Sequence, residues 1–137
     1  MGEILPDWPD MELVLLDLLA PVGNTVTSTG TDIPAGTIQV ERIGGPDDGV
    51  TDRPRMQVTA FGRTRAHAWA LIGQCRQRIL ASGGTLVSGE NVQNVFIDLA
   101  RTATPPRQLP EFGRGARIVQ AVFEIHVRRQ WAAQPSP

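Results

Sequence analysis

A strict alternation of apolar and polar residues near the C-terminal end most constrains the fold of this chain. Between Ile118 and Arg128 every second residue is apolar, namely Val119, Ala121, Phe123, Ile125 and Val127. Because successive side chains of a strand point to opposite faces, this period predicts a strand with one buried face. The stretch 92–103 places Val95, Ile97 and Leu99 on one face, and we expect it to form a second long strand beside the first.

Two shorter stretches, 37–43 and 55–61, also alternate, and they flank a turn of glycine, proline and aspartate at 44–49. This turn chemistry predicts an antiparallel hairpin with a broad tip. The Thr-, Ser- and Gly-rich residues 25–36 are typical of a loop, or of a loop that begins with a short edge strand at 25–27.

Two helices are predicted from caps and apolar spacing. Asp7 can serve as the N-cap of a helix that runs to about Leu19, and Thr64 can cap a second helix over 65–81. The second helix has a buried stripe of Ala68, Leu71, Ile72, Cys75 and Ile79. The element order predicts an α+β fold, an antiparallel or mixed β-sheet built from two hairpins with two α-helices packed on one face. We expect one domain over 1–131 and a disordered C-terminal tail at 132–137.

No residue pattern indicates catalysis, a metal site or a cofactor. His67 and His126 are the only histidines, and neither has a cysteine or aspartate at metal-ligand spacing. Cys75 lies on the predicted buried stripe and is typical of a small core residue. The chain has no nucleophile elbow, no P-loop and no dinucleotide-binding glycine motif. The sequence therefore favours a structural, non-catalytic protein.

Three carboxylates gather at the tip of the first hairpin, Asp47, Asp48 and Asp52. They could hold a hard cation, but the glutamate that completes an EF-hand loop is missing. The sequence favours a solvated tip, or a recognition surface whose carboxylates meet the arginines of a neighbour.

The long segment 104–115 is predicted to be a loop between the last two strands, since it carries three prolines and two glycines. Apolar residues flanked by arginines are common at protein interfaces, and this segment offers Arg107, Leu109, Phe112 and Arg114. Nucleic-acid binding fits less well, because Phe112 is the only aromatic residue there and Glu111 intervenes. A loop that is simply exposed and mobile in the free subunit is the alternative.

Charge and apolar content exclude several classes of protein. The formal net charge is −1, and all 13 basic residues are arginine, so the overall charge does not indicate a nucleic-acid or membrane partner. The longest strongly apolar run, Leu13–Leu16, is far shorter than the roughly 20 residues of a membrane-spanning helix. The first nine residues do not resemble a signal peptide. The single cysteine excludes an intrachain disulfide and suits a reducing cytoplasm.

Three parts of the stretch 33–71 carry a family resemblance: 39–45, 51–55, and the junction Phe61-Gly62-Arg63-Thr64-Arg65 into an alanine-rich helix. They resemble the tail terminator (tail completion) proteins of siphophages that infect actinobacteria. The resemblance implies a virion protein at the head–tail junction, assembled in the host cytoplasm. It also implies a ring, usually of six subunits, that caps the tail tube and offers its other face to a head-side connector or neck protein.

The partners implied by the resemblance are further copies of the chain, the tail tube protein and the head-side connector, with DNA passing through the channel without specific binding. We expect Asp47, Asp48, Asp52, Arg107, Leu109, Phe112 and Arg114 to contact neighbouring subunits or the tube. The alternatives are another head–tail connector or neck ring protein, a nucleic-acid-binding accessory protein, and a small ligand-binding or enzymatic domain.

Overall fold

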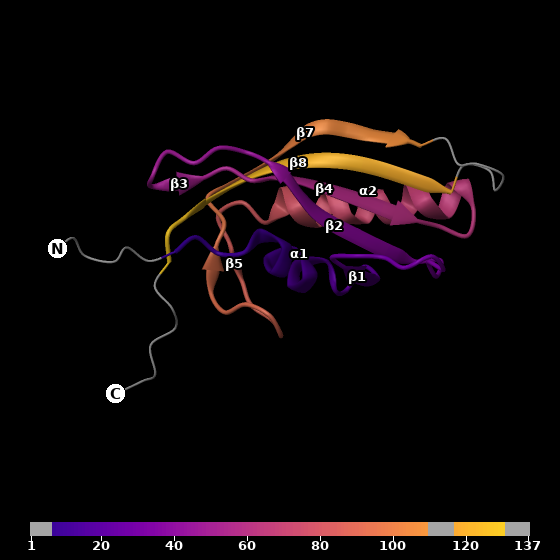
Figure 1. The fold of residues 1–137 in the computed structure, drawn as a ribbon, viewed down its shortest axis with the longest axis horizontal. Helices are drawn as coiled ribbons and strands as arrows, with labels where there is room; N and C mark the ends of the chain where they lie inside the picture. Colours follow the sequence, from indigo (N-terminus) through magenta and orange to yellow (C-terminus); the bar gives the residue numbers. More distant parts are fainter. Residues whose placement is uncertain (1–6, 110–116, 131–137) are drawn as a thin grey trace.

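The computed structural model describes residues 7–109 and 117–130. The predicted tail at 132–137 lies outside these residues. The elements follow in the order α1 (Met11–Leu19), β1 (Asn24–Val26), β2 (Thr37–Gly44), β3 (Thr51–Asp52), β4 (Arg55–Phe61), α2 (Arg65–Ala81), β5 (Leu86–Val87), β6 (Val95–Phe96), β7 (Leu99–Gln108) and β8 (Ile118–Arg128). Figure 1 shows them along the long axis of the molecule.

The main sheet is built from the two predicted hairpins, which lie side by side. β2 pairs antiparallel with β4, and β7 pairs antiparallel with β8. The hairpins join because β4 also pairs antiparallel with β8, from Phe61 opposite Ile118 to Arg55 opposite Glu124. Short β1 lies parallel to β2 at one edge, β7 forms the other edge, and β3 pairs with the last residues of β8.

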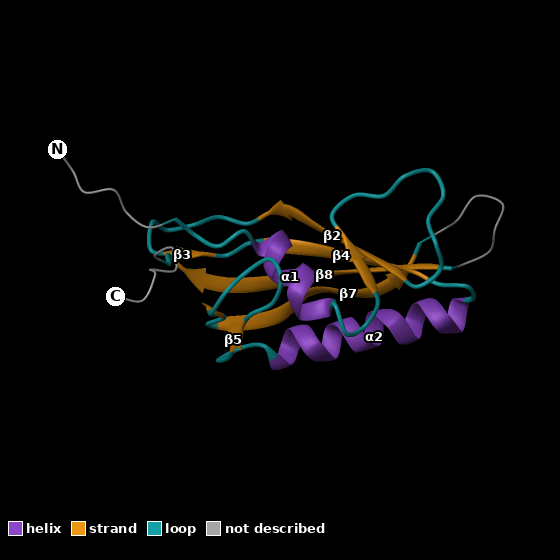
Figure 2. Cartoon of the chain, turned by 90° about the horizontal axis from the view of Figure 1, so that it is seen from below, coloured by secondary structure: helices purple, strands orange, loops and turns teal. Residues whose placement is uncertain are grey.

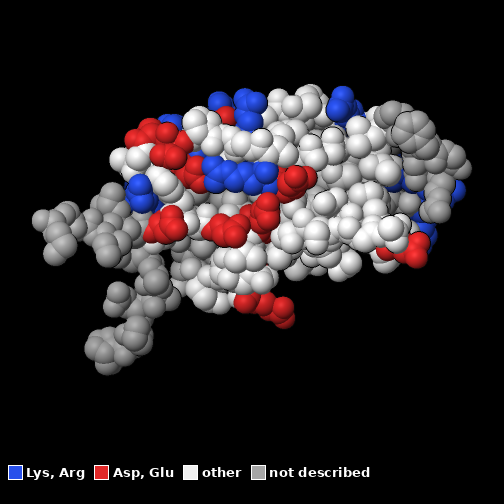
Figure 3. Space-filling view, viewed as in Figure 1, with Lys and Arg blue, Asp and Glu red and all other residues white. Residues whose placement is uncertain are grey.

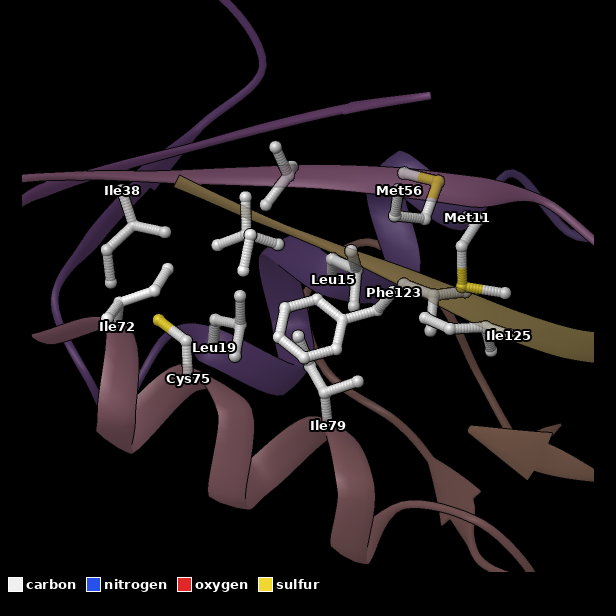
Figure 4. Packing of buried hydrophobic residues seen from close by; sticks show 14 of the residues in the cluster. Met11, Leu15, Leu19, Ile38, Met56, Ile72, Cys75, Ile79, Phe123 and Ile125 are labelled. Atoms are coloured by element: carbon white, nitrogen blue, oxygen red, sulfur yellow. The ribbon is translucent and has the colours of Figure 1, made fainter. Parts of the chain in front are cut away.

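Both helices cover the same face of the sheet, as Figure 2 shows, and the predicted α+β class is confirmed. The apolar residues of β8 and the whole predicted stripe of α2 are buried in one cluster between these layers. Figure 4 shows Phe123 inside this layer, with Leu15 of α1 and Ile79 of α2. Burying each large side chain of this kind contributes about 1.5–3 kcal/mol.

The cap of α2 is confirmed and that of α1 is corrected. Thr64 accepts a hydrogen bond from the His67 backbone N–H at 3.1 Å. The N-cap of α1 is Asp10, which accepts from the Glu12 backbone N–H at 3.0 Å, and not Asp7. Asp7 lies outside the helix, and its backbone carbonyl accepts a hydrogen bond from the Gln130 backbone N–H next to the end of β8.

The prediction of one continuous strand over 92–103 is wrong. Val95 and Ile97 are buried, but Leu99 is 42% exposed. The chain changes partner here, because β6 pairs with β5 in a separate small sheet and β7 then joins β8. In the new register Ala100 lies opposite buried Ile125, so Leu99 falls on the opposite face.

The loop predicted from residue 104 also begins later, since β7 extends to Gln108 and only then leaves β8. Pro105 and Pro106 lie within β7, where its pairing with β8 is irregular. Proline is tolerated there because β7 is an edge strand and needs no N–H on its outer side.

Candidate assembly surfaces

The tip of the first hairpin is organised around an ion pair between Arg42 and Asp52. The Asp52 side chain is 4% exposed, and both of its oxygens accept hydrogen bonds from the Arg42 guanidinium at 2.8 Å. The same guanidinium donates to the carbonyls of Gly44 and Gly45, which fixes the turn. The hydrogen bond to Asp52 raises the pKa of Arg42. The prediction of a solvated carboxylate is therefore wrong for Asp52, which the fold of the tip turns inward.

Asp47 and Asp48 are exposed, as predicted for the tip. Asp48 accepts hydrogen bonds from the backbone N–H groups of Thr51 at 2.7 Å and Val50 at 2.9 Å, and its other oxygen meets Arg53 at 3.1 Å. Asp47 accepts from the Gly49 backbone N–H at 3.0 Å. These bonds hold the loop between the two strands and leave both carboxylates on the surface.

The bonds to Asp48 predict how the tip responds to acid. The backbone hydrogen bond from Thr51, followed by that from Val50, lowers the pKa of Asp48 from 3.8 to about 2. A depressed pKa means that this contribution to stability is fully present above pH 3.8 and is lost as the pH falls to about 2. We expect a carboxyl titration by NMR to show this pKa, and the stability difference between wild type and Asp48→Asn to shrink over the same interval. An Asp48 pKa at its ordinary value would contradict the geometry.

Residues 7–12 pack against this tip. The Trp8 indole N–H donates to the Val50 carbonyl at 3.1 Å, and the Arg129 guanidinium lies 3.8 Å from the centre of the Trp8 ring. Glu12 accepts a hydrogen bond from the Arg42 backbone N–H at 3.0 Å. A groove of about 350 Å³ lies between these segments and is lined in part by Asp7, Asp10 and Glu12.

These contacts create one acidic surface from two parts of the sequence. We name it the acidic end and define it by Asp7, Asp10, Glu12, Asp47 and Asp48. Figure 3 shows acidic side chains, with arginines among them, at the end of the molecule where β3 lies. The tip carboxylates of this surface are predicted from the sequence, whereas those that precede and begin α1 are not.

Arginines gather at the opposite end of the sheet, where β4 leads into α2 and β7 leaves β8. We name this surface the arginine end and define it by Arg63, Arg65 and Arg107, all of which are exposed. Arg65 donates to the Gln108 side chain at 2.8 Å and lies 5.9 Å from the Trp69 ring centre.

The structure places predicted Arg107 and Leu109 at this arginine end. Leu109 is half-buried and donates its backbone N–H to the Ile118 carbonyl at 2.9 Å. Phe112 and Arg114 lie outside the described residues. Arg63 and Arg65 were missed as contact candidates because their chain segment joins this surface only through the pairing of β4 with β8.

The face of the main sheet opposite the helices is polar and carries charges of both signs, among them the exposed Glu41, Arg55 and Arg101. Cross-strand pairs of Gln39 with Thr59 and of Thr59 with Gln120 run across it. Glu124 is buried on this side and pairs with Arg101 and with His126, the latter at 2.9 Å. The hydrogen bond from His126, ahead of that from Arg101, lowers the Glu124 pKa.

The reactive groups considered in the sequence occupy structural positions. Cys75 is buried in the core, and burial raises the pKa of its thiol to about 12. One ring nitrogen of His67 accepts a hydrogen bond from the Arg63 backbone N–H at 2.9 Å. Within residues 7–109 and 117–130, no three His, Cys, Asp or Glu side chains are grouped so that they could hold a metal ion. No helix in this part of the chain is long and apolar enough to cross a membrane.

The sheet with both helices on one face leaves two exposed ends whose charged groups suit contacts with other chains. A family model described as phage tail termination protein matches residues 7–134. The chain belongs to this family and is a structural protein of a phage tail.

No curated protein matched the chain. Among solved structures, the chain is similar to one in the virion of a native gene transfer agent particle, with 13% identity, coverage of 84% of both chains and a TM-score of 0.41.

Proposed function

We propose that this protein is a tail terminator: a ring, expected to contain six subunits, that caps the finished tail tube and connects it to the head-side neck. The family match over residues 7–134 carries the proposal. A head-to-tail contact between identical subunits closes into a ring when the rotation at each contact permits it. Such a ring would end growth of the tube without any chemical reaction, so the proposed role is not enzymatic.

The proposed partners are other copies of this chain, the tail tube protein and the head-side connector. DNA would pass through the central channel without specific binding. The polar face of the sheet suits a channel lining, because charges of opposite sign lie side by side on it, as Arg55 and Arg101 do with Glu124, and such a surface binds the phosphate backbone weakly. The proposed host class is actinobacterial, with the ring at the top of the virion tail after assembly in the host cytoplasm.

The contact residues of this proposal are those at the two hairpin ends: Asp47, Asp48, Asp52, Arg107, Leu109, Phe112 and Arg114. Asp52 would act indirectly, since its carboxylate is occupied by Arg42 and holds the tip that carries Asp47 and Asp48. The other six would meet neighbouring subunits or the tube.

Electron microscopy of purified protein added to uncapped tail tubes tests the proposal, together with mass measurement of the protein in solution. We expect rings at the head-proximal end of the tubes and tubes that no longer lengthen. Rings that bind the head-side connector but not the tube would instead identify a neck protein, which is the second candidate.

A further inference from the structure

We propose that neighbouring subunits of the ring bind head to tail, with the arginine end of one copy seated on the acidic end of the next. The inference rests on the proposed ring and adds the surface that would build it. The occupant of the acidic end is thus a second copy of this chain, recognised through its guanidinium groups.

The two charged surfaces lie too far apart to pair within one subunit. β8 begins at Ile118, opposite the end of β4 from which Arg63 follows, and its last residue, Arg128, lies opposite Thr51 of the acidic tip. A strand rises about 3.4 Å per residue, so the eleven residues of β8 separate the two surfaces by roughly 34 Å. The arginine end of one subunit therefore cannot reach its own acidic end, but it can reach that of another copy.

Three carboxylates of the acidic end, those of Asp7, Asp10 and Asp47, are held in place and still have an oxygen to offer. One oxygen of each accepts a local backbone N–H: Trp8 for Asp7 at 2.8 Å, Glu12 for Asp10 at 3.0 Å and Gly49 for Asp47 at 3.0 Å. The second oxygen of each accepts no hydrogen bond from another described residue. A carboxylate fixed in this way loses little conformational freedom when an arginine binds.

The arginine end is a matching donor surface. Arg63, Arg65 and Arg107 are exposed, and none forms an ion pair with a carboxylate among residues 7–109 and 117–130. Arg65 is already oriented by Gln108 and Trp69. By contrast, the arginines at the acidic end are occupied locally, Arg42 by Asp52 and Arg53 by Asp48.

Each end also offers an apolar side chain close to its charges. Val50 is 63% exposed and lies between the tip carboxylates and Trp8. Leu109 is half-buried next to Arg107. An apolar contact flanked by charged pairs is a common form of protein interface, in which the charges set the register and partner.

A charge-swap experiment on the full-length chain tests this contact. One variant reverses the arginine end (Arg63→Glu with Arg107→Glu), and another reverses the acidic end (Asp7→Arg with Asp47→Arg). Each variant alone would place like charges at every contact, and we expect its self-association to weaken at least ~100-fold. An equimolar mixture restores opposite charges at every contact, so we expect rings in which the two variants alternate. A control variant reverses charges away from both ends (Arg76→Glu with Glu90→Arg) and should assemble as the wild type does.

Mass measurement and electron microscopy read out assembly, alone and on tail tubes, while circular dichroism confirms that each variant is folded. Assembly of the single variants at wild-type strength, or a mixture that stays apart, would overturn the head-to-tail contact while the capping function stands. A mixture that stays apart although both variants still bind the tube would identify the tube protein as the occupant. A wild-type protein that forms no ring, in solution or on tubes, would overturn both proposals.

Discussion

Replacing Phe123 by alanine is expected to lower the free energy of unfolding by about 3–5 kcal/mol. Phe123 is the largest fully buried side chain described, and it comes from the middle of β8, between β4 and β7. Its ring lies in the layer where α1 and α2 meet the sheet (Figure 4). The truncation would leave a cavity between the sheet and the two helices. Since a domain of this size is stable by about 5–15 kcal/mol, the loss would be severe.

Urea unfolding followed by far-UV circular dichroism measures the effect. Phe96→Ala is the matched control, because Phe96 is 38% exposed on the small sheet of β5 and β6. We expect this control to lose less than about 1.5 kcal/mol. Equal losses for the two variants would show that Phe123 is not at the centre of the core.

Replacing Gly45 by alanine is expected to cost about 3 kcal/mol or more, because two penalties add. Gly45 has a φ of +101°, a conformation that costs a residue with a side chain about 1–3 kcal/mol. An added Cβ would also lie 2.0 Å from the Arg53 carbonyl oxygen and 2.8 Å from the Arg55 nitrogen. Both neighbours are backbone atoms at the start of β4, so relief of the clash would displace the turn that Arg42 and Asp52 hold.

Gly49→Ala separates the clash from the backbone strain. Gly49 has a φ of +88°, but open space surrounds the position of its missing Cβ. We expect this control to cost only about 1–2 kcal/mol in the same thermal or urea unfolding measurement. Equal stability of Gly45→Ala and Gly49→Ala would contradict this prediction, because it would mean that the clash of the added Cβ with the backbone at Arg53 and Arg55 costs no free energy.

Elements with a strong local pattern could be predicted from the sequence almost to the residue. The strand 55–61, the helix 65–81 and the buried stripe that includes Cys75 agree with the structure. Where the chain changes its pairing partner the prediction failed, as at Leu99. Local periodicity does not reveal that β6 pairs with β5 before β7 joins β8.

The candidate surfaces could be predicted only in part. The composition of the hairpin tip correctly placed Asp47 and Asp48 on the surface, whereas Asp52 is buried because the tip folds back onto Arg42. Arg107 was identified within its own segment. Its neighbours Arg63 and Arg65 lie between the end of β4 and the start of α2. No pattern in that segment or in β7 indicates that these arginines and Arg107 meet.

The sequence by itself determined which side chains of α2, β2, β4 and β8 face the core, because hydrophobic period and cap chemistry act over a few neighbouring residues. Only the tertiary structure decided that β4 and β8 are neighbours, that Asp7 and Asp10 join Asp47 at one end, and that Arg63 and Arg65 join Arg107 at the other. The physical reason is that strand order depends on how two apolar faces can be covered together by α1 and α2. Strand order is set by packing between segments far apart in the chain, and the hydrophobic period of a single strand carries no information about it.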